Sequence, residues 1–194
     1  MKRLLSLILI SAIGTHAFAQ IEKGRIIIFS GTDLTMAFGK SVFENAGINI
    51  SDSKSRNISV SFGAGAFVAN NIAIGIEVPI ENSYLAIDND VEAQSSYGIM
   101  PFSRAYLSQS NFNPFISLGV GYIHISNLPN FLEANLYNGI MIEGGLGFTA
   151  FISENIGFDC QLLYGYSQMK NSEDSNLKLK VKALGIQVGF SIVL

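Results

Sequence analysis

The stretch LGIQVGFSIVL, residues 184–194, decides the fold of this chain. Its even-numbered positions carry large apolar side chains, from Leu184 through Phe190 to Leu194. Its odd-numbered positions carry Gly, Gln and Ser, with Val193 as the exception. Because successive side chains of a β-strand point to opposite faces, this pattern predicts a strand with one apolar face and one face that is mostly small or polar.

The same alternation recurs along the chain and predicts eight strands. The intervening connections alternate between short ones, at residues 70–71, 108–113 and 153–155, and longer polar ones, at 40–55, 86–93, 126–137 and 169–176. Outer-membrane barrels have short periplasmic turns and longer outer loops. We therefore expect an all-β protein, an eight-stranded antiparallel up-and-down transmembrane β-barrel. Its strands are predicted at residues 24–39, 56–69, 72–85, 94–107, 114–125, 138–152, 156–168 and 177–194.

The N-terminal residues have the three parts of a secretory signal peptide. Lys2 and Arg3 are basic, residues 4–13 are an apolar run too short to span a bilayer, and Ala17-Phe18-Ala19 is a cleavage motif. We expect a signal peptide at residues 1–19 and one barrel domain at residues 20–194. The chain has one Cys, so no intrachain disulfide can hold this domain together.

Two other architectures compete with the barrel. Residues 57–76 contain no Asp, Glu, Lys or Arg, as a transmembrane helix would, but their bulky side chains fall on one parity and Asn70-Asn71 interrupts them. A soluble lipocalin-like binding barrel would use the same alternation with its apolar face inside. The Gly- and Ser-rich face would then form an exterior almost without charge, which makes a poorly soluble surface.

Several stretches together resemble a known family. They are GRIIIFSGTDLTMAF, VSFGAGAFVANNIAIGIEV, YGIMPFSRAYL, NPFISLGVGY, IEGGLGFTAFISENIGFD and LGIQVGFSIVL. They are similar to the outer membrane protein beta-barrel domain family, the small OmpA-type eight-stranded barrels. The resemblance implies insertion in the cell outer membrane by the barrel-assembly machinery, with both chain ends in the periplasm.

Charged residues on the predicted inner face form the candidate functional group. Asp33, Glu77, Glu143 and Asp159 share the inward parity, and Arg104 is turned inward because an Arg facing lipid at mid-bilayer costs about 2–4 kcal/mol. The favoured interpretation is a structural polar network in a lumen filled by side chains, since buried charges are usually paired. The alternative is an ion path, because the acids outnumber the one base.

A second candidate lies at the outer end of the fifth predicted strand. The run His124-Ile125-Ser126-Asn127 is similar to one in lipid A 3-O-deacylases, membrane barrels in which a His activates a Ser nucleophile. Both side chains would face lipid, and Glu133 or Glu143 would have to orient the His. The match is four residues long, so we expect no catalytic residues and no enzyme, with the deacylase kept as an alternative.

The net charge and the absence of certain motifs limit the partners that can be expected. A formal net charge of −3 gives no reason to expect nucleic acid, and the sequence has no Walker loop and no Cys/His metal cluster. We expect no cofactor and no metal. The expected partners are outer-membrane lipid and lipopolysaccharide, the expected state is a monomer, and the expected role is structural, adhesive or recognition-like.

Overall fold

The computed structural model describes residues 21–35, 41–44, 49–50, 56–87, 90–126, 136–174 and 178–194. The predicted signal peptide lies outside these residues. The described part of the chain holds ten β-strands, β1 to β10. Their bounds are β1 Ile26–Thr35, β2 Ser41–Glu44, β3 Asn49–Ile50, β4 Arg56–Ala69, β5 Ile72–Ile87, β6 Asp90–Tyr106, β7 Phe112–Ser126, β8 Leu136–Phe151, β9 Ile156–Asn171 and β10 Lys178–Val193.

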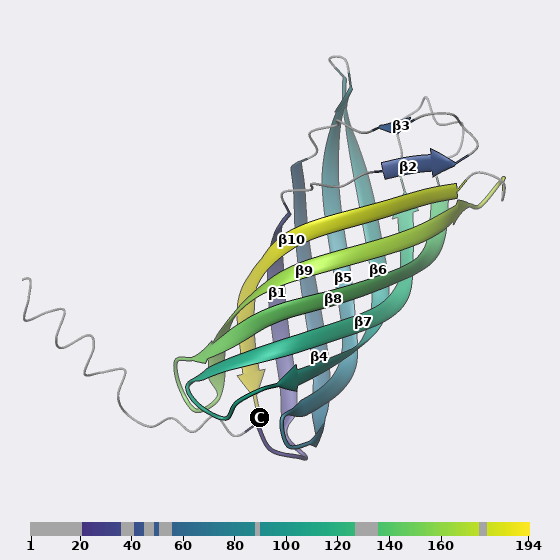
Figure 1. Cartoon of the computed structure of the whole chain (residues 1–194). Helices are drawn as coiled ribbons and strands as arrows, with labels where there is room; N and C mark the ends of the chain where they lie inside the picture. Colours follow the sequence, from purple (N-terminus) through teal and green to yellow (C-terminus); the bar gives the residue numbers. More distant parts are fainter. Residues whose placement is uncertain are drawn as a thin grey trace, which may run out of the picture.

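Eight of these strands form a closed barrel. Each pairs antiparallel with its neighbours in the order β1-β4-β5-β6-β7-β8-β9-β10, and β1 closes the ring on β10 from Ile27↔Val193 to Leu34↔Ile186. Figure 1 shows the tilted strands wrapping around one axis. The predicted fold class, an eight-stranded antiparallel up-and-down barrel, is confirmed.

The alternation of residue types along the strands corresponds to the inner and outer faces of the barrel. On β4 and β5, Phe62 and Ile76 are 56% and 51% exposed, whereas Ser61 on the opposite face is 1% exposed. The same alternation holds on β10, where Ile186 and Phe190 are exposed and Gln187 and Ser191 are buried. In these stretches the apolar set therefore forms the outer wall, and the small and polar set faces the lumen.

The two ends of the barrel differ. The short connections at residues 70–71, 107–111 and 152–155 lie at one end together with Ile21 and Leu194, and we call this the turn end (Figure 1). Asn71 has φ +69° in the two-residue turn between β4 and β5, a conformation that Asn adopts more readily than most residues. The amide of Asn71 donates to the carbonyl of Ile21 at 3.1 Å. The opposite end is the loop end.

Strand residues extend into all four predicted loops at the loop end, most extensively into two of them. The β5–β6 ladder continues to Ile87↔Asp90, so the predicted loop at 86–93 is mostly a projecting hairpin. Within the predicted loop at 40–55, β2 pairs with β10 from Val42↔Lys180 to Glu44↔Lys178, beyond the point where β1 ends. Backbone groups that a longer ladder can pair explain both extensions.

Candidate functional site

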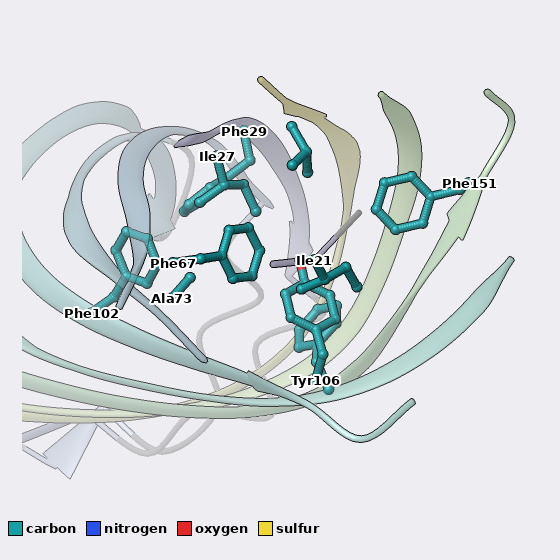
Figure 2. Close-up of a cluster of buried hydrophobic side chains, with 10 residues drawn as sticks. Ile21, Ile27, Phe29, Phe67, Ala73, Phe102, Tyr106 and Phe151 are labelled. Atoms are coloured by element: carbon teal, nitrogen blue, oxygen red, sulfur yellow. The ribbon is translucent and has the colours of Figure 1, made fainter. Parts of the chain in front are cut away.

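An apolar cluster fills the lumen at the turn end, and we call it the turn-end plug. Figure 2 shows its side chains converging inside the ring of strands. Ile21, which precedes β1, is completely buried among them. A closed barrel of eight strands leaves an interior that side chains can fill. The plug consists of Ile21, Ile27, Phe29, Phe67, Ala73, Phe102, Tyr106, Phe115, Phe151 and Val193.

Arg104 lies inside this plug, between two aromatic rings. Its guanidinium carbon is 4.6 Å from the centroid of the Phe29 ring and 4.3 Å from that of Phe115. Its Nη1 donates to Asp159 Oδ2 at 2.9 Å. Arg104 is 3% exposed, and its cation lies over two aromatic rings and pairs with a carboxylate.

Asp159 is held by donors from three other strands. Oδ2 accepts from Arg104 on β6 and from Ser191 Oγ on β10 at 2.5 Å, and Oδ1 accepts from Thr149 Oγ1 on β8 at 2.6 Å. A buried ion is tolerated when its charge is paired and its lone pairs are satisfied. The Arg104–Asp159 pair therefore ties β6, β8, β9 and β10 together across the lumen.

A chain of hydrogen bonds crosses the lumen next to this pair. Ser117 Oγ donates to Gln161 Oε1 at 3.1 Å, Gln161 Nε2 donates to Gln187 Oε1, and Gln187 Nε2 donates to Ser61 Oγ at 3.1 Å. The chain begins on β7 and ends on β4, which lie on different sides of the barrel. The lumen is thus crossed by bonded side chains above the plug.

The structure brings together two of the five predicted network residues, Arg104 and Asp159. Glu77 is buried, four residues nearer the loop end than Ala73, which faces Arg104 across β5 and β6. Glu143 is half-buried on the inner face of β8, six residues nearer the loop end than Thr149, and both glutamates take part in interactions. Asp33 lies on β1 opposite Gln187, and the position of its side chain is outside the described structure.

Sequence reasoning missed two parts of this arrangement. One is the pair Gln161 and Gln187, which stand at inward positions on β9 and β10 but carry no charge to draw attention. The other is the set of inward aromatics, which includes Phe29, Phe67 and Phe115 on strands whose inward Gly and Ser residues drew attention instead. The cluster could have been predicted from the position of these aromatic residues, because several of them share the inward parity near the turn end of their strands.

The second candidate lies on the outer wall at the loop end. His124 and Ser126 both take the outward parity of β7, as predicted, since Ile123 and Ile125 face inward. His124 Nδ1 is 2.6 Å from Asn138 Oδ1, and Asn138 Nδ2 donates to Ser172 Oγ at 2.7 Å. The His124 ring also packs on Tyr97, with centroids 4.8 Å apart. Asn138, unnoticed in the sequence, is thus the residue that orients His124.

Of the two acids considered for this group, Glu143 does not join it. Glu143 has the inward parity of β8, so the barrel wall separates it from His124. Glu133 lies outside the described residues. Ser126 Oγ donates to the carbonyl of Ser95 on β6 at 3.4 Å. The described arrangement is therefore a His–Asn pair with a serine two positions along the same strand face.

The described part of the chain lacks two other features. It contains no cluster of three or more His, Cys, Asp or Glu side chains placed to hold a metal ion. It also contains no helix with the length and hydropathy needed to cross a membrane.

Comparison with known proteins bears on the fold. No family model and no curated protein matches the sequence. The outer membrane protein OprG from Pseudomonas aeruginosa is similar in structure, with a TM-score of 0.53, 15% identity, and coverage of 89% of this chain and 97% of OprG. Neisserial surface protein A gives a TM-score of 0.62 and 13% identity, over 88% of this chain and 97% of that protein. The chain has the fold of the small eight-stranded outer-membrane β-barrels.

Proposed function

We propose that this protein is an integral outer-membrane β-barrel that acts through its outer surface, in a structural, adhesive or recognition role. The turn end, with both chain ends, faces the periplasm, and the loop end faces outward. The protein is exported by means of the predicted signal peptide and is inserted into the outer membrane by the barrel-assembly machinery. Its lipid partners are the outer-membrane lipids, including lipopolysaccharide, and the barrel acts as a monomer.

The observation that carries the proposal is the apolar outer wall. Exposed Ile, Leu, Val or Phe side chains stand on each of the eight barrel strands. On β6 the exposed apolar residue is Ile99, and Pro101 and Ser103 occupy the next two outward positions. A large exposed apolar surface on a soluble protein would promote aggregation, whereas a bilayer solvates it. A lipocalin-like barrel needs the opposite orientation, with its apolar residues inside.

The filled lumen supports action at the surface rather than transport. Arg104 and Asp159 neutralise each other within the turn-end plug, and the Gln161–Gln187 chain crosses the lumen beside them. An ion crossing the barrel would have to displace bonded side chains in both layers. The contacts therefore favour the structural interpretation of the inner charges over an ion path.

Membrane residence can be tested with the native chain. We expect extraction only by detergent and a band that migrates faster before boiling than after, because a compact barrel resists unfolding. The lone thiol, Cys160 on β9, gives a second readout because its neighbours on the outward parity are Phe158 and Leu162. A spin label there should be accessible to oxygen and shielded from a water-soluble paramagnetic ion. Recovery in the soluble periplasmic fraction would contradict the proposal.

One contact favours a second candidate function, a lipid A deacylase at the rim. His124 paired with Asn138 would present Nε2 to a substrate, as in Cys-His-Asn enzymes. An amide, however, stabilises a forming imidazolium less than a carboxylate does, and Ser126 bonds to the Ser95 carbonyl. We therefore favour the non-enzymatic role.

A further inference from the structure

Four lysines gather on one part of the outer wall, and we call them the lysine ladder. Lys178, Lys180 and Lys182 occupy alternate, outward positions of β10, and Lys170 lies on the neighbouring β9. Lys170 and Lys182 are exposed, and the other two are half-buried. The sequence has 12 Lys and Arg, two of them in the predicted leader, so the ladder holds four of the remaining ten.

The ladder begins where the apolar wall ends. A strand needs about 9–11 residues to cross a bilayer, and β10 has 16. Counted from Val193 at the turn end, that length ends near Leu184, and Lys182 is the next outward residue. Tyr166, opposite Lys182, and Tyr164, opposite Leu184, place tyrosines at the same level of β9. Tyrosines of this kind mark the boundary with the headgroups, so the ladder lies at headgroup level.

The spacing of the lysines is unfavourable for the protein alone. Lys170 and Lys178 stand directly opposite each other in the β9–β10 register, and like charges at such positions destabilise a sheet. The nearby acids are Glu44, opposite Lys178 on β2, and Glu173 and Asp174 after β9, while Lys180 and Asp174 each take part in an interaction. Among the described residues, the four cations outnumber these acids, and an anion in the headgroup layer would stabilise the remaining positive charge.

The ladder also continues into the rim group around His124. The residues His124, Asn138, Lys170 and Lys178 face one another in sequence across β7, β8, β9 and β10. This row carries hydrogen-bond donors and cations along one side of the loop end. A ligand on it would meet charge at one end and polar side chains at the other.

We propose that the lysine ladder is a docking site for the phosphate groups of lipopolysaccharide in the outer leaflet. The inference rests on the proposed function, since it requires the loop end to face outward. The ligand's acyl chains lie along the apolar wall below Leu184, and its phosphates contact Lys170, Lys178, Lys180 and Lys182. Basic residues at a membrane surface bind anionic headgroups through such charge complementarity.

The test measures binding of bisphosphorylated lipid A to the purified protein in detergent by native mass spectrometry. A fourfold variant, Lys170→Gln, Lys178→Gln, Lys180→Gln and Lys182→Gln, removes the charge, and the matched fourfold Lys→Arg variant keeps it. We expect the Gln variant to bind about tenfold more weakly or worse, and the Arg variant to bind within about threefold of the native protein. Rising ionic strength should weaken native binding, and dephosphorylated lipid A should bind like the Gln variant.

Three results would overturn the ladder as this site. They are native-like binding by the Gln variant, indifference to removal of the phosphates, and equal binding of phosphatidylglycerol, which would make the patch a general anion surface. Each variant is first checked for the band that shifts on boiling. If the folded barrel binds lipid A equally well with and without phosphates, only the lysine-ladder proposal is contradicted. If the chain is recovered outside membranes, the proposed function is contradicted.

Discussion

The same strands carry charges in two regions of the barrel, the turn-end plug and the loop-end rim formed by the lysine ladder and the group around His124. The two regions differ in how these charges are compensated. In the plug, the charges of Arg104 and Asp159 are buried and paired with each other, and the Arg104 guanidinium lies over the rings of Phe29 and Phe115. At the rim, Lys170 and its neighbours on β10 are arranged so that cations face cations. Buried charges must be compensated within the protein, while exposed ones can be compensated by a ligand. Under the proposed function, the turn end contributes stability to the barrel and the loop end contributes recognition.

The largest expected effect comes from breaking the buried ion pair at Arg104. Replacing Arg104 by Ala leaves the Asp159 carboxylate buried with only two hydroxyl donors, from Thr149 and Ser191. We expect the free energy of unfolding to fall by about 3–5 kcal/mol, because the remaining partner of a buried ion pair is left uncompensated. Urea unfolding in lipid vesicles measures this loss. Lys170→Ala at the exposed rim is the control and should change little.

A second variant separates the contribution of the ion pair from that of the aromatic packing. Adding Asp159→Asn to Arg104→Ala removes the stranded charge, so the double variant should be more stable than Arg104→Ala alone. If the double variant were less stable by the sum of two single losses, the two residues would act independently. The plug would then depend on its aromatic packing rather than on the ion pair.

The packing of the plug is tested at a glycine. A methyl group at Gly63 would overlap the Phe29 ring, which stacks on Arg104. We expect Gly63→Ala to cost about 2–3 kcal/mol of unfolding free energy, the range of overpacking in a filled interior. Gly165→Ala is matched, because a methyl group there has no atom within 4 Å. It should leave stability unchanged or slightly higher, and similar losses for both variants would argue against a tightly filled plug.

The hydrogen-bond chain above the plug gives a smaller expected effect. Gln187→Leu keeps much of the side-chain volume but leaves Gln161 Nε2 and Ser61 Oγ without this partner. We expect a loss of about 1–2 kcal/mol, because buried polar atoms that lose a hydrogen bond carry a desolvation cost. Gln168→Leu, on the exposed face of β9, is the control. Equal unfolding midpoints for the two would show that the chain adds nothing to stability.

The sequence was most informative where the bilayer dictates the residue type. Strand faces followed from alternation because outward positions must be apolar and inward ones must fit a narrow lumen, as on β10 from Leu184 to Ile192. The tight turn at Asn70-Asn71 followed for a similar reason, since few residues accept a positive φ. Such constraints act on one residue at a time, so a single sequence reveals them.

The sequence was least informative where residues far apart must meet. Arg104 and Asp159 are 55 positions apart, and nothing local to either selects Asp159 over Glu77 or Glu143. Their pairing depends on the stagger of the strands around the barrel. The same holds for His124 and Asn138, which are 14 positions apart on neighbouring strands. There the proposed acid, Glu143, was excluded by parity, while the amide that does contact His124 carries no charge.

The smallest expected effect concerns catalysis at the rim. Ser126→Ala should leave lipid A unchanged, because the native protein should remove no acyl chain from it. His124 is oriented by a neutral amide, and the Ser126 hydroxyl contacts the Ser95 carbonyl, so the nucleophile has no described base. Mass spectrometry of lipid A from cells that express the native protein, Ser126→Ala or His124→Ala measures this directly. Loss of one 3-linked acyl chain in native cells, absent from both variants while each barrel still folds, would make the rim an active site and would give the lysine ladder the task of holding its substrate.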